Sequence, residues 1–183
     1  AKLVAFEQGG FRGDYSVGLA ETYKLLVKNL PKKDVAQEKG VYNIIGASAW
    51  RYRMASDIWE VKNLLSEALG LSCNACLCCD TSVEELQALG KAQVNIVLGS
   101  EGLAAAKLLE EKFGTPYVYA VPYGYSGTAT FLESVGEAVG EVPSPLVLMR
   151  LRMKEKGMSM LSMFAMMGGG KTKQTVVKGD YDL

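Results

Sequence analysis

Asn95-Ile96-Val97-Leu98-Gly99 (95–99) is the stretch that decides the fold, because this apolar run ends in glycine and leads into a helical pattern. Such a run is typical of a buried parallel strand that enters a loop at the edge of a sheet. Val41-Tyr42-Asn43-Ile44-Ile45-Gly46 (41–46) has the same pattern. We therefore predict two buried parallel strands whose carboxyl ends, at Gly46 and Gly99, lie on one edge of a sheet.

Strand and helix patterns alternate around these two runs. Strand, helix, strand at this spacing gives right-handed crossovers and a parallel sheet that is covered on both faces. The sequence thus predicts an α/β fold over 41–140, a Rossmann-like parallel sheet with helices on both faces. The expected strands are 41–46, 71–79, 94–98 and 117–121, and the expected helices are 57–69 with Gly70 as its cap, one starting at 83 with a Ser82–Glu85 capping box, 102–113 and 128–139.

Two flanking segments are predicted on either side of this unit. Residues 1–33 read as the end of a preceding domain or an added strand–helix unit, with a short buried strand at 3–6 and a helix at 15–30. Residues 31–40 are polar and charged, which is typical of a linker. Residues 146–183 read as a methionine-rich helix and a strand leading toward a further domain.

Composition excludes several classes of function. The 20 basic and 20 acidic residues balance, which argues against a nucleic-acid binder that works through a strong basic field. No apolar run is long enough to predict a membrane span. The absence of histidine excludes Ser-His-Asp and Cys-His catalysis and histidine-dependent metal sites. Four cysteines crowd into seven positions, too close to staple a domain, so we expect a reducing, cytoplasmic location.

The cysteine cluster has a functional and a structural interpretation. Thiolates at short spacing bind zinc or iron–sulfur clusters. On a regular strand, however, Cys73 and Cys79 would face one side while Cys76 and Cys78 face the other. We therefore expect core cysteines and no metal site, with Cys78 and Cys79 as the candidates for a reactive pair.

Basic and glycine-rich loops supply the other candidate site residues. Arg51 and Arg53 flank Tyr52 just beyond the first predicted strand, where they could hold an anionic cofactor or substrate. A solvated loop is equally compatible with this pattern. The P-loop-like stretch 165–172 follows a predicted helix, and it precedes a strand, so we interpret it as an interdomain turn. No G-x-G-x-x-G loop follows the strand 41–46, which argues against a plain dinucleotide domain.

The order and spacing of these motifs resemble the component 1 proteins of the nitrogenase family, especially the α-type subunits. The resemblance covers nearly the whole chain. It rests on the Gly10-Phe11-Arg12-Gly13 turn with Gly18 in a helix, on 41–46, Leu64-Leu65, Gly70-Leu71, 95–98, 108–116, 122–128, and on Gly170-Lys171 with Gly179-Asp180.

The resemblance implies a nitrogenase-like oxidoreductase component 1. Such a subunit pairs with a homologous component 1 subunit and receives electrons from an ATP-dependent iron protein. It carries an iron–sulfur cluster or related metallocofactor in the full assembly. This chain would supply mainly the middle domain, and alone it is expected to be inactive.

The sequence departs from the family pattern at two positions. In molybdenum nitrogenase α-subunits, a cysteine ligates the cofactor at the position that matches Gly99, and a histidine-rich stretch corresponds to Gly18-Leu19-Ala20. We therefore expect a reductase of a substrate other than dinitrogen, or alternatively a non-catalytic metallocluster scaffold or cofactor-assembly subunit. No metal ligand is predicted in the chain. The expected cofactor-binding residues are Gly10, Arg12, Gly13, Arg51, Arg53, Gly99 and Ser100.

Overall fold

The computed structural model describes residues 3–6, 13–48, 51–77 and 79–157. Within them, one parallel sheet has the strand order β2-β1-β3-β4. Its strands are β1 (Val41–Ile45), β2 (Ser72–Leu77), β3 (Val94–Val97) and β4 (Tyr117–Tyr119). The helices are α1 (Tyr15–Asn29), α2 (Met54–Leu69), α3 (Val83–Gln87), α4 (Leu103–Phe113), α5 (Gly124–Val139) and α6 (Pro145–Glu155), with short 3-10 turns η1 (Leu89–Lys91) and η2 (Ser100–Gly102).

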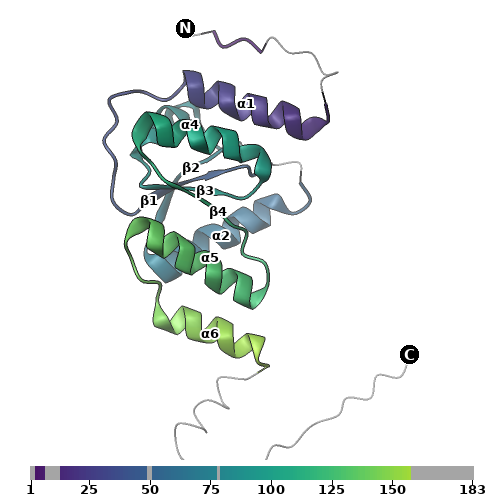
Figure 1. Cartoon of the computed structure of the whole chain (residues 1–183), viewed down its shortest axis with the longest axis vertical. Coiled ribbons are helices and arrows are strands. Elements are labelled where there is room, and N and C mark those ends of the chain that lie inside the picture. Colours follow the sequence, from purple (N-terminus) through teal and green to yellow (C-terminus); the bar gives the residue numbers. More distant parts are fainter. Residues whose placement is uncertain (1–2, 7–12, 49–50, 78, 158–183) are drawn as a thin grey trace, which may run out of the picture.

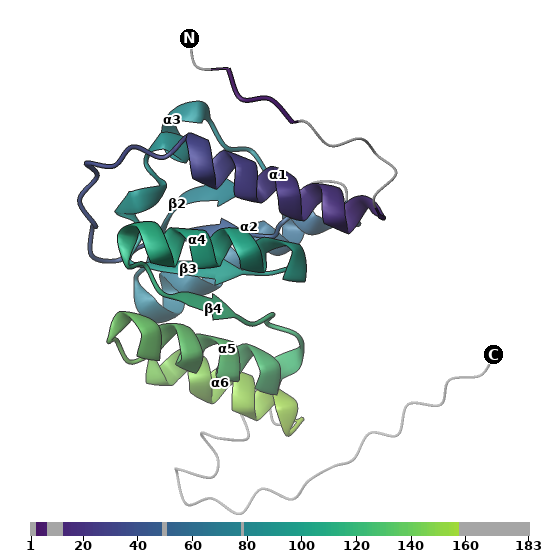
Figure 2. The ribbon, with the colours of Figure 1, turned by 45° about the horizontal axis from the view of Figure 1, so that its top comes forward.

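Helices cover both faces of the sheet (Figures 1 and 2). α1 and α4 lie on one side, and α2, α5 and α6 lie on the other. Successive side chains along each strand point to opposite faces of the sheet, so the core is divided into two clusters, one on each face. Ile45 and Val97 pack with residues of α1 and α4, whereas Ile44 and Ile96 pack with residues of α2 and α5. The predicted α/β fold class is confirmed.

The two described helices outside 41–140, α1 and α6, pack onto this unit. α1 lies against α4 and places the fully buried Tyr23 and Val27 in the core. α6 lies against α5 and buries Val147 and Met153. The division of the chain into 1–33, 41–140 and 146–183 stays a prediction, and the part of the last segment beyond 157 lies outside the described residues.

The capping signals in the sequence are confirmed. The Ser82 side chain accepts a hydrogen bond from the Glu85 amide, and the Glu85 carboxylate accepts one from the Ser82 amide. Gly70 ends α2 in the left-handed conformation, at φ +66°. α5 begins four residues earlier than predicted, because Gly124 and Gly127 weaken its first turn as a sequence signal.

The strand predicted at 3–6 is wrong. Leu3 and Phe6 are exposed, and no strand forms over these residues. An apolar run becomes a strand only where a partner strand satisfies its backbone. In the described part of the chain, 3–6 has no such partner.

A bulge in β2 changes which of its side chains share a face. Tyr42 pairs with Cys73, but the next residue of β1, Asn43, pairs with Ala75, so Asn74 is an extra residue. Asn74 Nδ2 donates to Asn43 Oδ1 at 2.8 Å, and Asn43 Nδ2 donates to Asn95 Oδ1 at 2.9 Å. This chain of side-chain amides, fully buried at Asn43 and Asn95, joins β2, β1 and β3. It accounts for the extra residue, because Asn74 must point to the side of Asn43.

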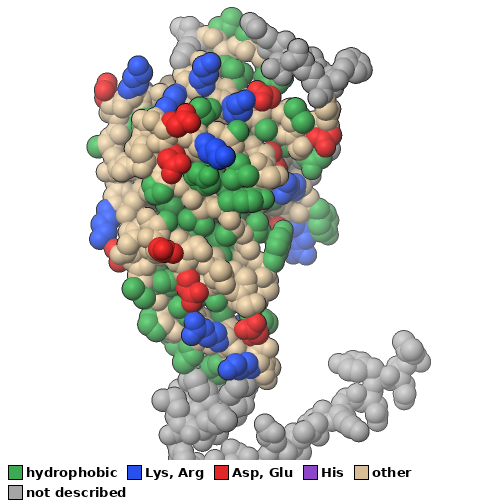
Figure 3. All heavy atoms as spheres, in the orientation of Figure 1, with side chains coloured by type: hydrophobic (Ala, Val, Ile, Leu, Met, Phe, Trp, Pro, Cys, Tyr) green, Lys and Arg blue, Asp and Glu red, His purple; other side chains and the backbone are tan. Residues whose placement is uncertain are grey.

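The surface in Figure 3 mixes acidic and basic side chains, and hydrophobic side chains gather across its middle, between α4 and α5. β4 forms this edge of the sheet, and its Tyr119 is 52% exposed. Among the described residues, no helix has both the length and the apolar character that crossing a membrane requires.

Gly46 and Gly40 offer a matched pair for testing the contact between β1 and β3. Both have φ +78°, but a Cβ at Gly46 would lie 2.6 Å from the Gly99 carbonyl oxygen, whereas nothing lies within 4 Å of one at Gly40. We expect Gly40→Ala to lower the free energy of unfolding by about 1 kcal/mol, the cost of the left-handed backbone. Gly46→Ala should cost about 2 kcal/mol more, because its methyl group has no space. Urea denaturation measures both, and equal losses would contradict the close contact.

Candidate functional site

The order of strands reverses between β1 and β3. β2 lies on one side of β1, and β3 and β4 follow on the other. In open α/β sheets, ligands bind beyond the carboxyl ends of the strands at such a reversal. The described residues of the loops that follow these two strands, 46–48 and 51–53 after β1 and 98–102 after β3, therefore form the candidate site.

The backbones of these two loops touch. A Cβ at Gly99 would lie 2.6 Å from Glu101 Oε2 and 2.7 Å from the Gly46 carbonyl oxygen. A Cβ at Gly102 would lie 2.9 Å from the Gly46 amide nitrogen. Gly99 itself has φ −145°, which any residue can adopt. Lack of space, and not backbone conformation, therefore excludes a side chain at position 99.

A partly buried ion pair bridges the same two loops. Arg51 Nη2 lies 2.7 Å from Glu101 Oε1, and the Glu101 side chain is 2% exposed against 35% for Arg51. A carboxylate removed from water needs a compensating cation. Arg51 therefore neutralises an internal charge, and in this arrangement its guanidinium is engaged with the protein.

The other predicted site residues take different positions. Arg53 precedes α2 in the left-handed conformation, at φ 58°, and is exposed, with no ion pair among the described residues. Ser100 opens η2 and is also exposed. Gly13 precedes α1, which contacts η2. Gly10 and Arg12 lie outside the described residues. The structure thus brings Arg51, Gly99 and Ser100 to one edge, whereas the role of each predicted residue in binding stays a prediction.

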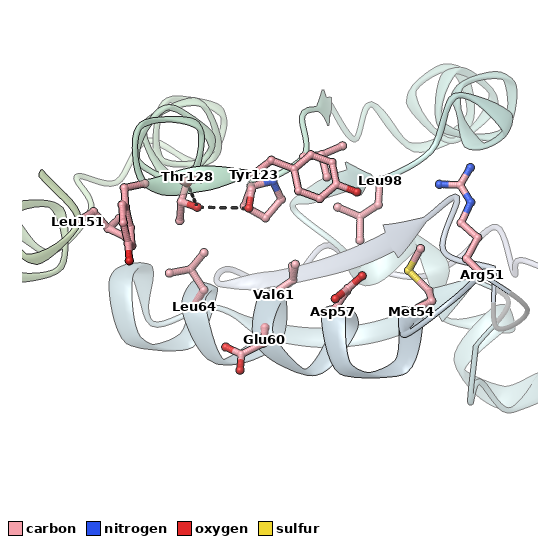
Figure 4. Close-up of a pocket in the computed structure, with 14 residues that line it drawn as sticks. Arg51, Met54, Asp57, Glu60, Val61, Leu64, Leu98, Tyr123, Thr128 and Leu151 are labelled. Carbon is pink, nitrogen blue, oxygen red and sulfur yellow. Dashed lines mark hydrogen bonds between the residues drawn. The ribbon is translucent and has the colours of Figure 1, made fainter. Parts of the chain in front are cut away.

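A groove of about 430 Å³ extends from Arg51 along α2. Figure 4 shows Met54, Val61 and Leu64 of α2 facing the β4–α5 loop, with Leu151 of α6 at the far end. The Thr128 hydroxyl holds this loop through the carbonyl oxygens of Pro122 and Gly124, at 3.3 and 2.6 Å. The remaining lining residues are Arg51, Asp57, Glu60, Leu98, Val121, Tyr123 and Tyr125.

The sequence did not predict this groove. Its α2 residues belong to an ordinary amphipathic helix, and nothing in their spacing distinguishes them from core residues. The available signal was the run Pro122-Tyr123-Gly124, which the strand pattern places at the carboxyl edge. Tyr123 is 78% exposed, so its ring is available to a ligand or to another part of the protein.

Cys73 and Cys79 share one side of the sheet as predicted, but the prediction that Cys76 lies on the opposite side is wrong. Cys76 is buried in the core cluster on the α2 and α5 side, and Cys73 and Cys79 pack against the same cluster. The bulge at Asn74 is the reason, because one extra residue reverses the alternation between Cys73 and Cys76. Cys78 lies outside the described residues.

The described residues do not form a metal-binding site. Among them, no group of three or more cysteine, aspartate or glutamate side chains could hold one ion. Burial raises the pKa of the Cys73 thiol above its ordinary value, which favours the protonated form over the thiolate that metals require. Since position 99 also lacks space for a side chain, the residues of this edge do not fit a directly ligated metallocluster.

Comparison with known proteins gives a consistent result. The family model described as "Nitrogenase component 1 type Oxidoreductase" matches residues 1–182. The protein named as the B subunit of light-independent protochlorophyllide reductase in Jannaschia sp. (strain CCS1) is 31% identical over 142 residues, which cover 77% of this chain and 27% of the relative. The "Nitrogenase iron-molybdenum cofactor biosynthesis protein NifE" of Clostridium pasteurianum is 29% identical over 140 residues, covering 76% and 30%.

A solved structure supports the fold assignment. "Nitrogenase Cp1 at pH 5" matches with a TM-score of 0.62 at 24% identity, covering 78% of this chain and 28% of that one. At this identity the match concerns the fold alone. The chain spans less than a third of the length of these relatives.

Removing Arg51 tests the ion pair. We expect Arg51→Met to lower the free energy of unfolding by about 2 kcal/mol, because it leaves the Glu101 carboxylate buried without a cation. Arg53→Met is the matched control on the same loop and should change stability by no more than about 0.5 kcal/mol. Adding Glu101→Gln to Arg51→Met should restore at least about 1 kcal/mol. Equal effects of the two arginine substitutions in urea denaturation would argue against the pair.

Proposed function

Because the chain belongs to the nitrogenase component 1 type oxidoreductase family, we propose that it is the middle segment of a nitrogenase-like component 1 subunit that reduces a substrate other than dinitrogen. The subunit would receive electrons from an ATP-dependent iron protein and would assemble with a homologous component 1 subunit. One observation supports the claim that the substrate is not dinitrogen. Position 99, which the resemblance matches to a cofactor-ligating cysteine, has no space for any side chain.

The redox centre of such a protein would lie outside the described residues. An iron–sulfur cluster or related metallocofactor supplies electron transfer in the full assembly. The residues described here do not fit a site that ligates this cofactor. We propose that they line the substrate cleft instead. Clustering of four cysteines in seven positions supports the additional proposal of a reducing, cytoplasmic location.

The groove supports a flat, largely apolar substrate. Its floor and roof are mainly aliphatic and aromatic, and Arg51 stands at the end nearest the carboxyl edge. Relatives named for protochlorophyllide reductase suggest a tetrapyrrole as one member of this class. Since Arg51 is paired with Glu101, we propose that Arg53 supplies the cation for an anionic substituent. Gly10, Arg12, Gly13, Gly99 and Ser100 remain the other proposed binding residues.

A scaffold or cofactor-assembly subunit is the second candidate. Similarity to a protein named for cofactor biosynthesis favours it. Such a subunit would hold a metallocluster for transfer and would not turn over a substrate.

Turnover separates the two candidates. The full-length protein would be mixed anaerobically with its homologous partner, the iron protein, MgATP and dithionite, and then offered protochlorophyllide or dinitrogen. We expect ATP-dependent consumption of the tetrapyrrole and no ammonia. ATP-independent binding of a metallocluster without turnover would favour the scaffold, and ammonia formation would contradict the proposal.

Arg53→Gln tests the proposed cation in the same assay. Loss of one charge-assisted contact should raise the KM for an anionic substrate about tenfold with little change in kcat. Arg152→Gln is the control, because Arg152 pairs with Glu133 on the surface of α5 and α6. If both variants keep the wild-type KM, Arg53 does not bind the substrate.

A further inference from the structure

A backbone hydrogen bond at the carboxyl end of β2 brings two cysteines together. The Cys79 amide donates to the Cys76 carbonyl oxygen at 2.7 Å. A bond from residue i+3 to residue i closes a β-turn, in which the end Cα atoms lie within about 7 Å. Disulfides span Cα separations of about 4.4–6.8 Å, so the backbone brings Cys76 and Cys79 to bridging range.

The two side chains share one side of the sheet and differ in exposure. Both pack against the core cluster between the sheet and the helices α2 and α5. Cys76 is 2% exposed, whereas Cys79 is partly accessible. An external reagent would therefore meet Cys79 first, and Cys76 would be the protected neighbour that completes a bridge.

The Thr81 hydroxyl holds the backbones of Cys76 and Cys79 close together without a disulfide bond. The hydroxyl oxygen lies 2.5 Å from the Cys76 carbonyl oxygen and 3.3 Å from that of Cys79, and it accepts from the Cys76 amide at 3.0 Å. The capping box of Ser82 then anchors the start of α3. Since these hydrogen bonds already hold the backbones of Cys76 and Cys79 close together, joining the two residues loses little conformational entropy.

We propose that Cys76 and Cys79 form a reversible dithiol–disulfide pair at the carboxyl end of β2. With a small-molecule disulfide as oxidant, the Cys79 thiolate attacks one sulfur, forms a mixed disulfide and releases one thiolate. The Cys76 thiolate then attacks Cys79 Sγ, which forms the protein disulfide and releases the second thiolate. Two protein thiols are oxidised, the small disulfide is reduced to two thiols, and these take up the two protons. The pair gives this segment a two-electron centre that needs no metal.

Cys73 is the described competitor. Its thiol donates to the Ala75 carbonyl oxygen at 3.4 Å, and burial raises its pKa, so its thiolate form is disfavoured at neutral pH. The extended strand β2, with its bulge at Asn74, separates Cys73 from Cys76. No turn brings the backbones of these two cysteines together. Cys73→Ala is therefore a suitable control for the reaction.

Thiol counting tests the pair in the 183-residue chain. The protein would be equilibrated with mixtures of glutathione and glutathione disulfide, quenched in acid, denatured and labelled with N-ethylmaleimide before intact mass measurement. We expect four labels in the reduced form and two in the oxidised form. Chymotrypsin cleaves after Leu77, so a Cys76–Cys79 bridge should link two separate peptides. Four labels under all oxidising mixtures, or a bridge within one peptide, would overturn the proposal.

Variants identify the partners. Cys73→Ala and Cys78→Ala should each still lose two thiols, whereas Cys76→Ala should accumulate the glutathione mixed disulfide at Cys79. Cys79→Ala should react at least about tenfold more slowly, because it lacks the accessible thiol. Far-UV circular dichroism checks that each variant is folded. If one is not, the peptide map of the unsubstituted chain still shows whether the bridge spans Leu77, and fragmentation of the linked peptides identifies its two cysteines. Persistence of the bridge in Cys76→Ala or Cys79→Ala would assign it to another pair.

Discussion

The contact between Gly46 and Gly99 is the constraint on which the rest of this structure depends. At the reversal of strand order, the chain leaving β1 meets the chain leaving β3 backbone to backbone. This closeness leaves no space for a side chain at either glycine. It also brings the loop of Arg51 beside the turn of Glu101, so that one ion pair can close the edge.

The close contact of the loops after β1 and β3 determines where a ligand can bind. A nitrogenase-like fold normally suggests chemistry at the ends of its strands, but here that position holds touching glycines and a neutralised carboxylate. The accessible space lies next to it, in the groove between α2 and the β4–α5 loop. The segment is thus better suited to forming the wall of a cleft than to ligating a cluster. Any redox chemistry of its own would come from the Cys76 and Cys79 thiols at the carboxyl end of β2.

Sequence reasoning predicted the fold because its signals are local. The apolar runs ending at Gly46 and Gly99, the cap at Gly70 and the capping box at Ser82 each depend on neighbouring residues. It failed where an outcome depended on distant partners. The bulge at Asn74 arises from an amide chain across three strands, and the pairing of Arg51 with Glu101 joins residues fifty positions apart. Residues 3–6 have the composition of a strand, but the described part of the chain offers them no partner strand.

Hydrogen exchange of single amides tests the closed edge most directly. The Leu98 amide donates to the Ile45 carbonyl oxygen at 2.9 Å, and the Gly102 amide donates to that of Gly99 at 2.9 Å. If the edge is part of the core, both should exchange as slowly as the Ile96 amide in the middle of β3, through global unfolding. Exchange of Leu98 and Gly102 many times faster than that of Ile96 would show that the edge opens independently, and would contradict the account.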